Sequence, residues 1–393
     1  MEYFVGKEHV YVFLITTQQF FVDRVKFGID EIMDIERLRK LITSQVFSDS
    51  NSVVEIHSLS LALYQKYLAP FIEHMETGIT ELTIIPDGQF NYLPFELLLT
   101  KDPYIIQDGS KDLVYLIKEF SIQYGYSASL LFGAGSPQNT SPSKGLIAFA
   151  PSYPSKSHGL AGNTKFGRFR DQISGLKWNG PEIIKIQNHI GGELFAGPDA
   201  TEHVFKSKVQ EFNVIHLAMH ALVDDEDPMN SKLVFTQKKD SLEDNMLHAY
   251  ELYNMNIPAN LAVLSACETG YGKMAKGEGV MSLARAFSYA GCPSVVMSHW
   301  SVNDAATAKL MGYFYKYLAD GQEKHVALRN AKLEFLEQAD PAQAHPYFWG
   351  GFVLVGDARP LELGEKWTWL FYLLVSIPMV GLVYILINWK TKK

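Results

Sequence analysis

Two reactive side chains, Cys267 and His220, each follow a short apolar run that is typical of a β-strand. Cys267 lies in the segment SACETG after the run Leu261–Leu264, and His220 ends the segment HLAMH, 47 residues earlier. In an open parallel sheet, chemistry collects beyond the carboxyl ends of the strands. A thiol and an imidazole placed there on separate strands can act as nucleophile and base. The pattern therefore indicates the chemistry of a cysteine protease.

The two residues would have distinct roles in catalysis. The thiolate of Cys267 is the nucleophile, and His220 would take its proton and return it to the leaving amine. The oxyanion of the tetrahedral intermediate needs backbone N–H donors, for which Ala221 and Cys267 are the natural candidates. An unpaired cysteine is more often a small buried hydrophobe, so the residues alone leave that alternative open.

A metal site is the competing use of the same residues. His216 would share a strand face with His220, since side chains alternate along a strand. His216, His220 and Cys267 could then ligate a metal, but zinc normally takes three or four supported protein ligands. No fourth ligand is evident, and we expect neither a metal nor another cofactor.

Each of the acidic residues near the pair has two possible roles. Asp304 follows another apolar run and could line the substrate pocket or cap the helix after it. Asp224 and Asp225 belong to the acidic run 224–227 just beyond His220. Such a run is usually a solvated loop, yet it could attract a basic side chain of a substrate.

The composition is that of a folded chain of catalytic size. The 393 residues are 47% hydrophobic and 20% charged, so they can bury a core. The formal charge of −8 argues against a nucleic-acid partner, which usually needs a basic face. Two cysteines are too few for a disulfide framework or a multi-cysteine zinc module.

Apolar runs alternate with amphipathic segments, which predicts an α/β fold. Helices are expected over Glu278–Ala290, ended by Gly291, and over 324–337, with another after Ser301, whose spacing to Asp304 resembles a capping box. The Met1–Val22 segment predicts two strands around a turn. The other predicted strands are Val10–Thr16, Leu82–Ile85, Leu146–Ala150, Asn213–Met219, Leu261–Leu264, Ser294–Ser298 and Phe352–Val355.

The end of the chain differs in kind. Residues 367–389 form a stretch of 23 without a charge, with tryptophans at both ends. As a helix the stretch would be roughly 35 Å long, enough to cross a hydrocarbon core of about 30 Å. It predicts a single-pass membrane anchor followed by the short basic tail 390–393. The lack of a secretory signal before the body favours a cytoplasmic body, whereas the basic tail favours the opposite orientation.

Several segments together resemble the CHAT domain, a family of caspase-like cysteine peptidases related to caspases and separase. The resemblance covers nearly everything from the first strands to Asp357. It rests on ELTIIPDGQFNYLPFELL (81–98), IHLAMHALVDDEDPMNSKLVF (215–235), LAVLSACETG (261–270), GEGVMSLARAFSYAGCPSVVMSHWSVNDAAT (277–307) and HPYFWGGFVLVGD (345–357).

The resemblance implies a caspase-like, mostly parallel sheet flanked by helices on both faces. It divides the chain into an N-terminal part (1–134), a loop-rich connection (135–180) and a catalytic half (181–360). The family's catalytic pair falls on His220 and Cys267, and the 47-residue spacing resembles that of caspases. The family usually has glycine after the histidine, where this chain has Ala221, and a site that needs positive φ would strain an alanine.

The leading hypothesis is a membrane-anchored cysteine endopeptidase that cuts a protein substrate through an acyl-enzyme. Family members often occur beside tetratricopeptide repeats or in bacterial defence modules, which implies an activating sensor protein or repeat domain as partner. A non-catalytic membrane scaffold is the alternative, supported by Ala221. A small-molecule hydrolase or acyltransferase with the same dyad also stays open.

Overall fold

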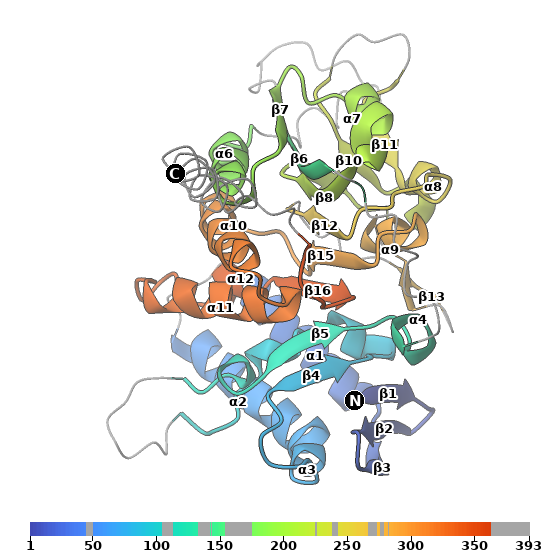
Figure 1. The fold of residues 1–393 in the computed structure, drawn as a ribbon. Coiled ribbons are helices and arrows are strands. Elements are labelled where there is room, and N and C mark those ends of the chain that lie inside the picture. Colours follow the sequence, from blue (N-terminus) through green and yellow to red (C-terminus); the bar gives the residue numbers. More distant parts are fainter. Residues whose placement is uncertain are drawn as a thin grey trace, which may run out of the picture. The chain divides into compact units, whose positions relative to one another are not determined.

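The predicted strands of the body lie in one sheet, except Val10–Thr16, which belongs to a separate small sheet (Figure 1). The computed structural model describes residues 1–44, 50–103, 113–132, 142, 144–153, 175–224, 226–237, 243–265, 273–275, 279–281 and 283–362. The eight strands of the sheet are, in spatial order, β4 (Glu81–Ile84), β5 (Ser121–Tyr124), β16 (Phe352–Gly356), β15 (Ser294–Ser298), β12 (Leu261–Leu264), β8 (Phe212–Leu217), β6 (Lys144–Pro151) and β7 (Glu193–Gly197).

The sheet consists of two parallel blocks that run in opposite directions. β4, β5 and β16 are parallel to one another, as are β15, β12, β8, β6 and β7. The blocks meet where β16 pairs antiparallel with β15. The carboxyl ends of β8 and β12 therefore lie together at one end of the sheet, and those of β5 and β16 lie at the other.

Burial explains why β8, β12 and β15 form the centre of the sheet. Every residue of these three strands is buried. Near-continuous apolar runs of this kind are typical of parallel strands that are covered on both faces. The fold is therefore mixed α/β with a large, mostly parallel sheet, as the sequence predicted.

Helices cover both faces of this sheet. On one face, α6 (Asn179–Ile190) packs against β6 and β7, α11 (Lys324–Glu337) packs against β5 and β16, and α10 (Asp304–Ala319) lies between the two helices (Figure 1). On the opposite face, Phe149 of β6 contacts Phe205 of α7 (Glu202–Lys208). That layer continues into α8 (Ala249–Leu252) and α9 (Leu283–Tyr289).

The N-terminal segment forms a small sheet of its own rather than a strand of the main one. It has three antiparallel strands, β1 (Glu2–Val5), β2 (His9–Ile15) and β3 (Phe20–Lys26). The prediction of two strands around one turn missed β3, whose residues are all exposed or only partly buried. Glu2 bridges to Ile85, which joins this sheet to the end of β4.

Two predicted helices begin later than expected. Residues 279–281 are strand β14, which pairs with β13 (Lys273–Ala275), so α9 begins only at Leu283. Gly291 ends this helical segment as predicted, with a φ of +110°. The cap of α10 is Asn303, whose side chain accepts a hydrogen bond from the N–H of Ala306, so the capping box expected at Ser301 and Asp304 is wrong. The predicted bounds of α11 are confirmed.

The remaining elements complete the described fold. The helices are α1 (Ile29–Thr43), α2 (Ser50–Tyr67), α3 (Ala69–Ile72), α4 (Ala128–Phe132) and α12 (Pro346–Trp349). The small sheet β11-β10-β9 comprises Met246–His248, Lys232–Val234 and His220–Leu222. The 3₁₀ helices η1 to η5 are Gly88–Tyr92, Phe95–Leu97, Leu116–Lys118, Val209–Glu211 and Pro228–Asn230.

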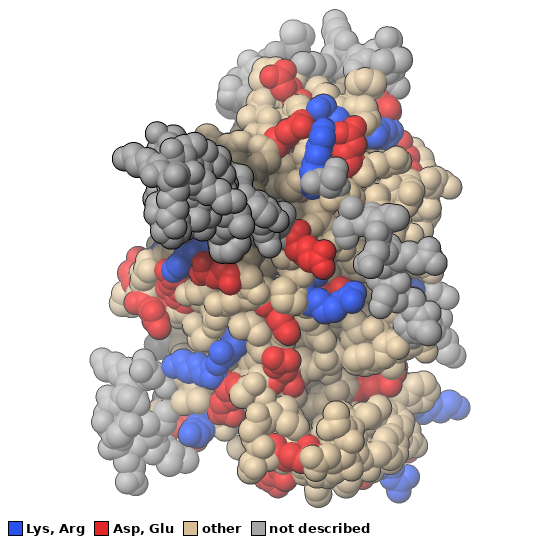
Figure 2. Space-filling view, viewed as in Figure 1, with Lys and Arg blue, Asp and Glu red and all other residues tan. Residues whose placement is uncertain are grey.

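Residues Met1–Leu361 form one compact unit, to which both predicted halves contribute strands of the main sheet. Over the face shown in Figure 2, acidic and basic side chains are interspersed rather than gathered by sign. Within the described residues, no helix combines the length and the apolar character that crossing a membrane requires. The predicted anchor 367–389 and the tail 390–393 lie outside the described residues.

Candidate functional site

His220 lies just past the end of β8 and begins another strand. β8 ends at Leu217, and His220 is the first residue of β9, paired in register with Val234 of β10. The prediction that one strand would run through Met219, with His216 and His220 on one face, is therefore wrong. The break leaves His220 partly buried at the carboxyl end of the main sheet, whereas His216 is fully buried inside it.

Tyr153 contacts His220 through both its hydroxyl and its ring. Its hydroxyl donates to the carbonyl of Val234 (2.7 Å) and accepts the backbone N–H of His220 (3.0 Å). The two rings lie with their centroids 4.7 Å apart. Because Tyr153 is bonded to both β9 and β10, it fixes where the imidazole of His220 leaves the backbone. Sequence reasoning missed this residue, since it falls within the predicted loop-rich connection 135–180.

The strand that leads to Cys267 ends level with the strand that leads to His220. β12 and β8 are adjacent and parallel, and Leu264 pairs in register with Leu217. Ser265 follows β12 directly and is 7% exposed. Cys267 itself lies outside the described residues, two positions further along the chain. The two chain segments predicted to carry the reactive pair therefore leave the sheet side by side.

Ala221 lies in the extended strand β9, opposite Leu233 of β10. Among the described residues, Asn245 is the non-glycine residue with a positive φ. Ala221 is thus not held in the left-handed conformation that favours glycine. The backbone strain considered for an alanine at this position is not present.

His216 is a core histidine. Its Nε2 lies 2.9 Å from Glu182 Oε1, and its Nδ1 lies 3.1 Å from the hydroxyl of Tyr315. Both ring nitrogens are therefore engaged by protein groups from α6 and α10. Burial and the nearby Glu182 raise the pKa of Tyr315 well above its usual value, so its hydroxyl stays protonated. The alternative in which His216, His220 and a thiol bind a metal has no support in these contacts.

Glu182 is a polar residue of the site that sequence reasoning missed. It is 2% exposed, on the face of α6 that also buries Ile183 and Ile186. Its Oε1 accepts a hydrogen bond from Ser265 Oγ (2.6 Å) in addition to its contact with His216. A carboxyl group at an apolar position of an amphipathic helix is the signal that could have revealed it, because such groups are seldom buried without partners.

Two of the acidic residues predicted near the pair accept hydrogen bonds from backbone N–H groups. Asp304 Oδ2 accepts the backbone N–H groups of Lys177 and Trp178, both at 2.9 Å, at the start of α6. Asp224 accepts the backbone N–H groups of Glu226 and Asp227, which closes the turn after β9. Asp225 lies outside the described residues.

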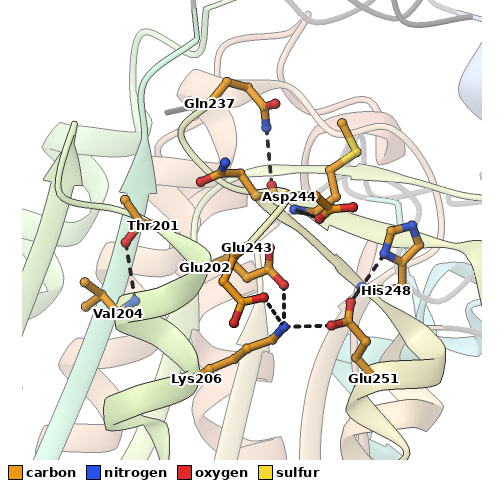
Figure 3. A network of polar contacts seen from close by, with 11 residues as sticks. Thr201, Glu202, Val204, Lys206, Gln237, Glu243, Asp244, His248 and Glu251 are labelled. Atoms are coloured by element: carbon orange, nitrogen blue, oxygen red, sulfur yellow. Dashed lines mark hydrogen bonds and ion pairs between the residues drawn. The ribbon is translucent and has the colours of Figure 1, made fainter. Parts of the chain in front are cut away.

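A second charged cluster lies between α7 and α8. The ammonium of Lys206 contacts Glu202 (2.7 Å), Glu243 (2.8 Å) and Glu251 (2.7 Å), as Figure 3 shows. Burial lowers the pKa of Lys206, but hydrogen bonds to the three carboxylates outweigh that effect and raise it. The three glutamates are close enough to hold a metal ion, yet the lysine already supplies their counter-charge. We regard this cluster as structural.

A cavity of about 730 Å³ lies at the opposite end of the sheet from His220. It is lined by residues that follow β5 and β16 and by residues that precede β15, among them Tyr126, Asp357 and Cys292. Burial raises the pKa of the Cys292 thiol to about 12, and its Sγ donates to the carbonyl of Ser294. Cys292 is fully buried in the turn before β15.

Two curated proteins resemble the chain over most of its length. Human tetratricopeptide repeat protein 28 is 25% identical over 338 residues, and the mouse protein is 24% identical over 343 residues. Both matches cover 75% of this chain but only 13% of the relative. The chain thus spans a small part of the length of these relatives.

The solved structures to which the chain is similar are remote from it in sequence. The Arg-specific cysteine proteinase gingipain R has a TM-score of 0.42 at 11% identity, covering 84% of this chain and 74% of that one. Separase in the Saccharomyces cerevisiae separase–securin complex also has a TM-score of 0.42, at 15% identity over 78% of this chain and 17% of that one.

The chain also matches a family model over most of its length. The CHAT domain model matches residues 57–357, which include every strand of the main sheet and both segments that lead to the predicted reactive pair. The chain belongs to the CHAT domain family.

Proposed function

We propose that the protein is a cysteine-type endopeptidase in which His220 is the base and Cys267 the nucleophile. The observation that carries the proposal is that β8 and β12 are adjacent and parallel and end level with each other, so the segments that lead to His220 and Cys267 begin at neighbouring strand ends. Tyr153 adds a second support, because a catalytic base must be oriented as well as near. Membership of the CHAT family is consistent with this chemistry.

The reaction would proceed in two halves. His220 removes the thiol proton of Cys267, and the thiolate attacks the scissile carbonyl to form a carbon–sulfur bond. The intermediate collapses as the carbon–nitrogen bond breaks, and His220 gives its proton to the leaving amine. A water molecule then hydrolyses the thioester and restores the thiol. The backbone N–H groups of Ala221 and Cys267 are proposed as donors to the oxyanion.

Alkylation with iodoacetamide tests the pair without knowledge of the substrate. The chain has two cysteines, and the buried Cys292 has a thiol pKa raised to about 12, so labelling near neutral pH reports on Cys267. An activated Cys267 should react faster than an ordinary thiol, and His220→Ala should lower its rate about tenfold or more, since the thiolate is the reacting form. His203→Ala, which changes a histidine of α7, is the matched control.

Cleavage completes the test. Cys267→Ala should abolish cleavage of any protein that the wild-type chain cuts, because the other thiol of the chain, Cys292, is buried. Cleavage by the Cys267→Ala protein would contradict the peptidase proposal. Equal and slow labelling of the wild-type and His220→Ala proteins would favour the alternative, a non-catalytic scaffold of the same fold.

We extend the proposal to the setting of the site. The uncharged stretch 367–389 is proposed as a membrane anchor for the peptidase body. Because the curated relatives are named for tetratricopeptide repeats and are much longer than this chain, a repeat-containing sensor is proposed as the activating partner. Accessibility of the body to added protease in intact cells tests which side of the membrane it faces.

A further inference from the structure

The first turn of α6 binds the ends of three neighbouring strands. Asn179 donates from Nδ2 to the carbonyl of Pro151 at the end of β6 (2.9 Å) and to that of Ala218 just after β8 (3.4 Å). Glu182, one turn further, reaches the residue after β12 through Ser265. Side chains one turn apart lie on the same face of a helix, so this single turn spans the end of the sheet where the proposed pair is carried.

Glu182 is the most constrained member of this turn. One oxygen, Oε1, accepts from Ser265 Oγ at 2.6 Å and lies 2.9 Å from His216 Nε2. Ser265 is two positions before Cys267, and His216 is four positions before His220. The same oxygen therefore joins the chain segment that precedes the proposed nucleophile to the segment that precedes the proposed base.

The helix that carries Glu182 is itself fixed in place. Asp304, in the first turn of α10, accepts the backbone N–H groups of Lys177 and Trp178 at the start of α6. Tyr315, further along α10, contacts the other nitrogen of His216. Because both helices bond to the same histidine, Glu182 has little freedom to move away from Ser265.

We propose that Glu182 is the positioning residue of the site, which ties the segments that precede Cys267 and His220 to each other by holding Ser265 and His216 on one carboxyl oxygen. This inference rests on the proposed function. Glu182 acts through these two side chains and not on the reacting atoms. Glu182 is too deeply buried to be solvated, and Ser265 and His216 supply the polar partners that compensate the burial of its carboxyl group. A misplacement of about 1 Å in a catalytic group can cost about 100-fold in rate.

Ser265→Ala is the most direct test, because it removes one hydroxyl and leaves the contact between Glu182 and His216. We expect the rate of Cys267 alkylation by iodoacetamide near neutral pH to fall about tenfold or more, with its pH dependence displaced toward that of an ordinary thiol. Ser294→Ala is the matched control. Ser294 is also fully buried, donates to the carbonyl of Asp357 (2.6 Å), and lies at the far end of the neighbouring strand β15. In the Ser294→Ala protein, the rate of Cys267 alkylation should stay within about twofold of the wild-type rate, with the same pH dependence.

Glu182→Gln provides a conservative second variant. The amide oxygen can still accept a hydrogen bond from Ser265. If that hydrogen bond is what matters, Cys267 should be alkylated faster in Glu182→Gln than in Glu182→Ala. Thermal unfolding of each variant shows whether it is folded at the assay temperature, and the comparison of rates is made among folded proteins.

The outcomes separate the two proposals. If wild-type Cys267 reacts quickly and Ser265→Ala reacts with the same rate and pH profile, the positioning role of Glu182 is wrong while the peptidase proposal stands. If wild-type Cys267 reacts no faster than a free thiol and His220→Ala changes nothing, the peptidase proposal fails. Glu182 is then only a core partner of His216.

Discussion

Burial distinguishes the two histidines of the segment HLAMH. His216 is fully buried and has both ring nitrogens engaged, whereas His220 is partly buried and lies over Tyr153. The sequence favoured His220 as the base because it is the second histidine of the family's motif. The structure supplies a physical reason for the same choice, since a base must reach a substrate and a core histidine cannot.

At residue scale, Ala221→Gly should not improve the site. Ala221 lies in the extended strand β9, so glycine would add backbone freedom that the native conformation does not use. We expect the free energy of unfolding to fall by about 0.5–1 kcal/mol, with the alkylation rate of Cys267 little changed. Urea denaturation and iodoacetamide labelling measure the two effects. A several-fold gain in labelling rate would show that the site needs the glycine of the family pattern.

At the scale of elements, the start of α10 is where the local pattern was misleading. Ser301 and Asp304 have the spacing of a capping box, but Asn303 caps the helix and Asp304 bonds to the chain before α6. Both arrangements satisfy N–H groups near a helix start, and only the second also holds two helices together. The local spacing could not choose between them, because the partner of Asp304 lies more than 120 residues away.

The cap of α10 can be tested with two neighbouring substitutions. Asn303→Ala removes the acceptor for the N–H of Ala306 and should lower the free energy of unfolding by about 1 kcal/mol, the usual cost of losing a helix cap. Ser301→Ala, at an exposed position, is the control and should leave stability nearly unchanged. Urea denaturation of both proteins gives the comparison. If Ser301→Ala lowered the free energy of unfolding more than Asn303→Ala, the capping box at Ser301 would be supported after all.

At the scale of the whole molecule, buried ionisable groups make stability depend on pH. His299 follows β15 and is 3% exposed. Burial, reinforced by the positive charges of Arg39 and Lys332, lowers its pKa from the ordinary 6.5 to about 3. Burial also lowers the pKa of His345, to about 4. Because each pKa is depressed in the folded state, the unfolded chain binds protons first as the pH falls.

This linkage predicts a loss of stability in mild acid that His299→Gln should reduce. The contribution of His299 is fully present above about pH 6.5 and is lost as the pH falls toward 3, at about 1.4 kcal/mol per pH unit. Between about pH 7 and pH 4, the wild-type protein should therefore lose about 3 kcal/mol more than the variant. Urea denaturation at several pH values measures both slopes, and identical slopes would contradict a neutral, buried His299.

Strand positions could be read from the sequence more fully than the site could. β12 and β15 coincide with their predictions, because a run buried on both faces leaves a continuous apolar signal in the chain itself. β3 and β9 were missed, since their residues are largely exposed or partly buried and leave no such signal. The order of the strands, and the reversal of direction between β16 and β15, depend on pairings between distant segments.

The sequence by itself determined the fold class, the family and the candidate pair, because apolar runs and the SACETG motif are local features of the chain. Only the tertiary structure decided how the site is supported. It placed His220 at the start of a new strand over Tyr153, and it brought a carboxyl group from α6 to Ser265. Those contacts join residues 67 and 83 positions apart, and no local pattern encodes them. They form because the parallel order of β6, β8 and β12 brings three strand ends beneath one turn of a helix.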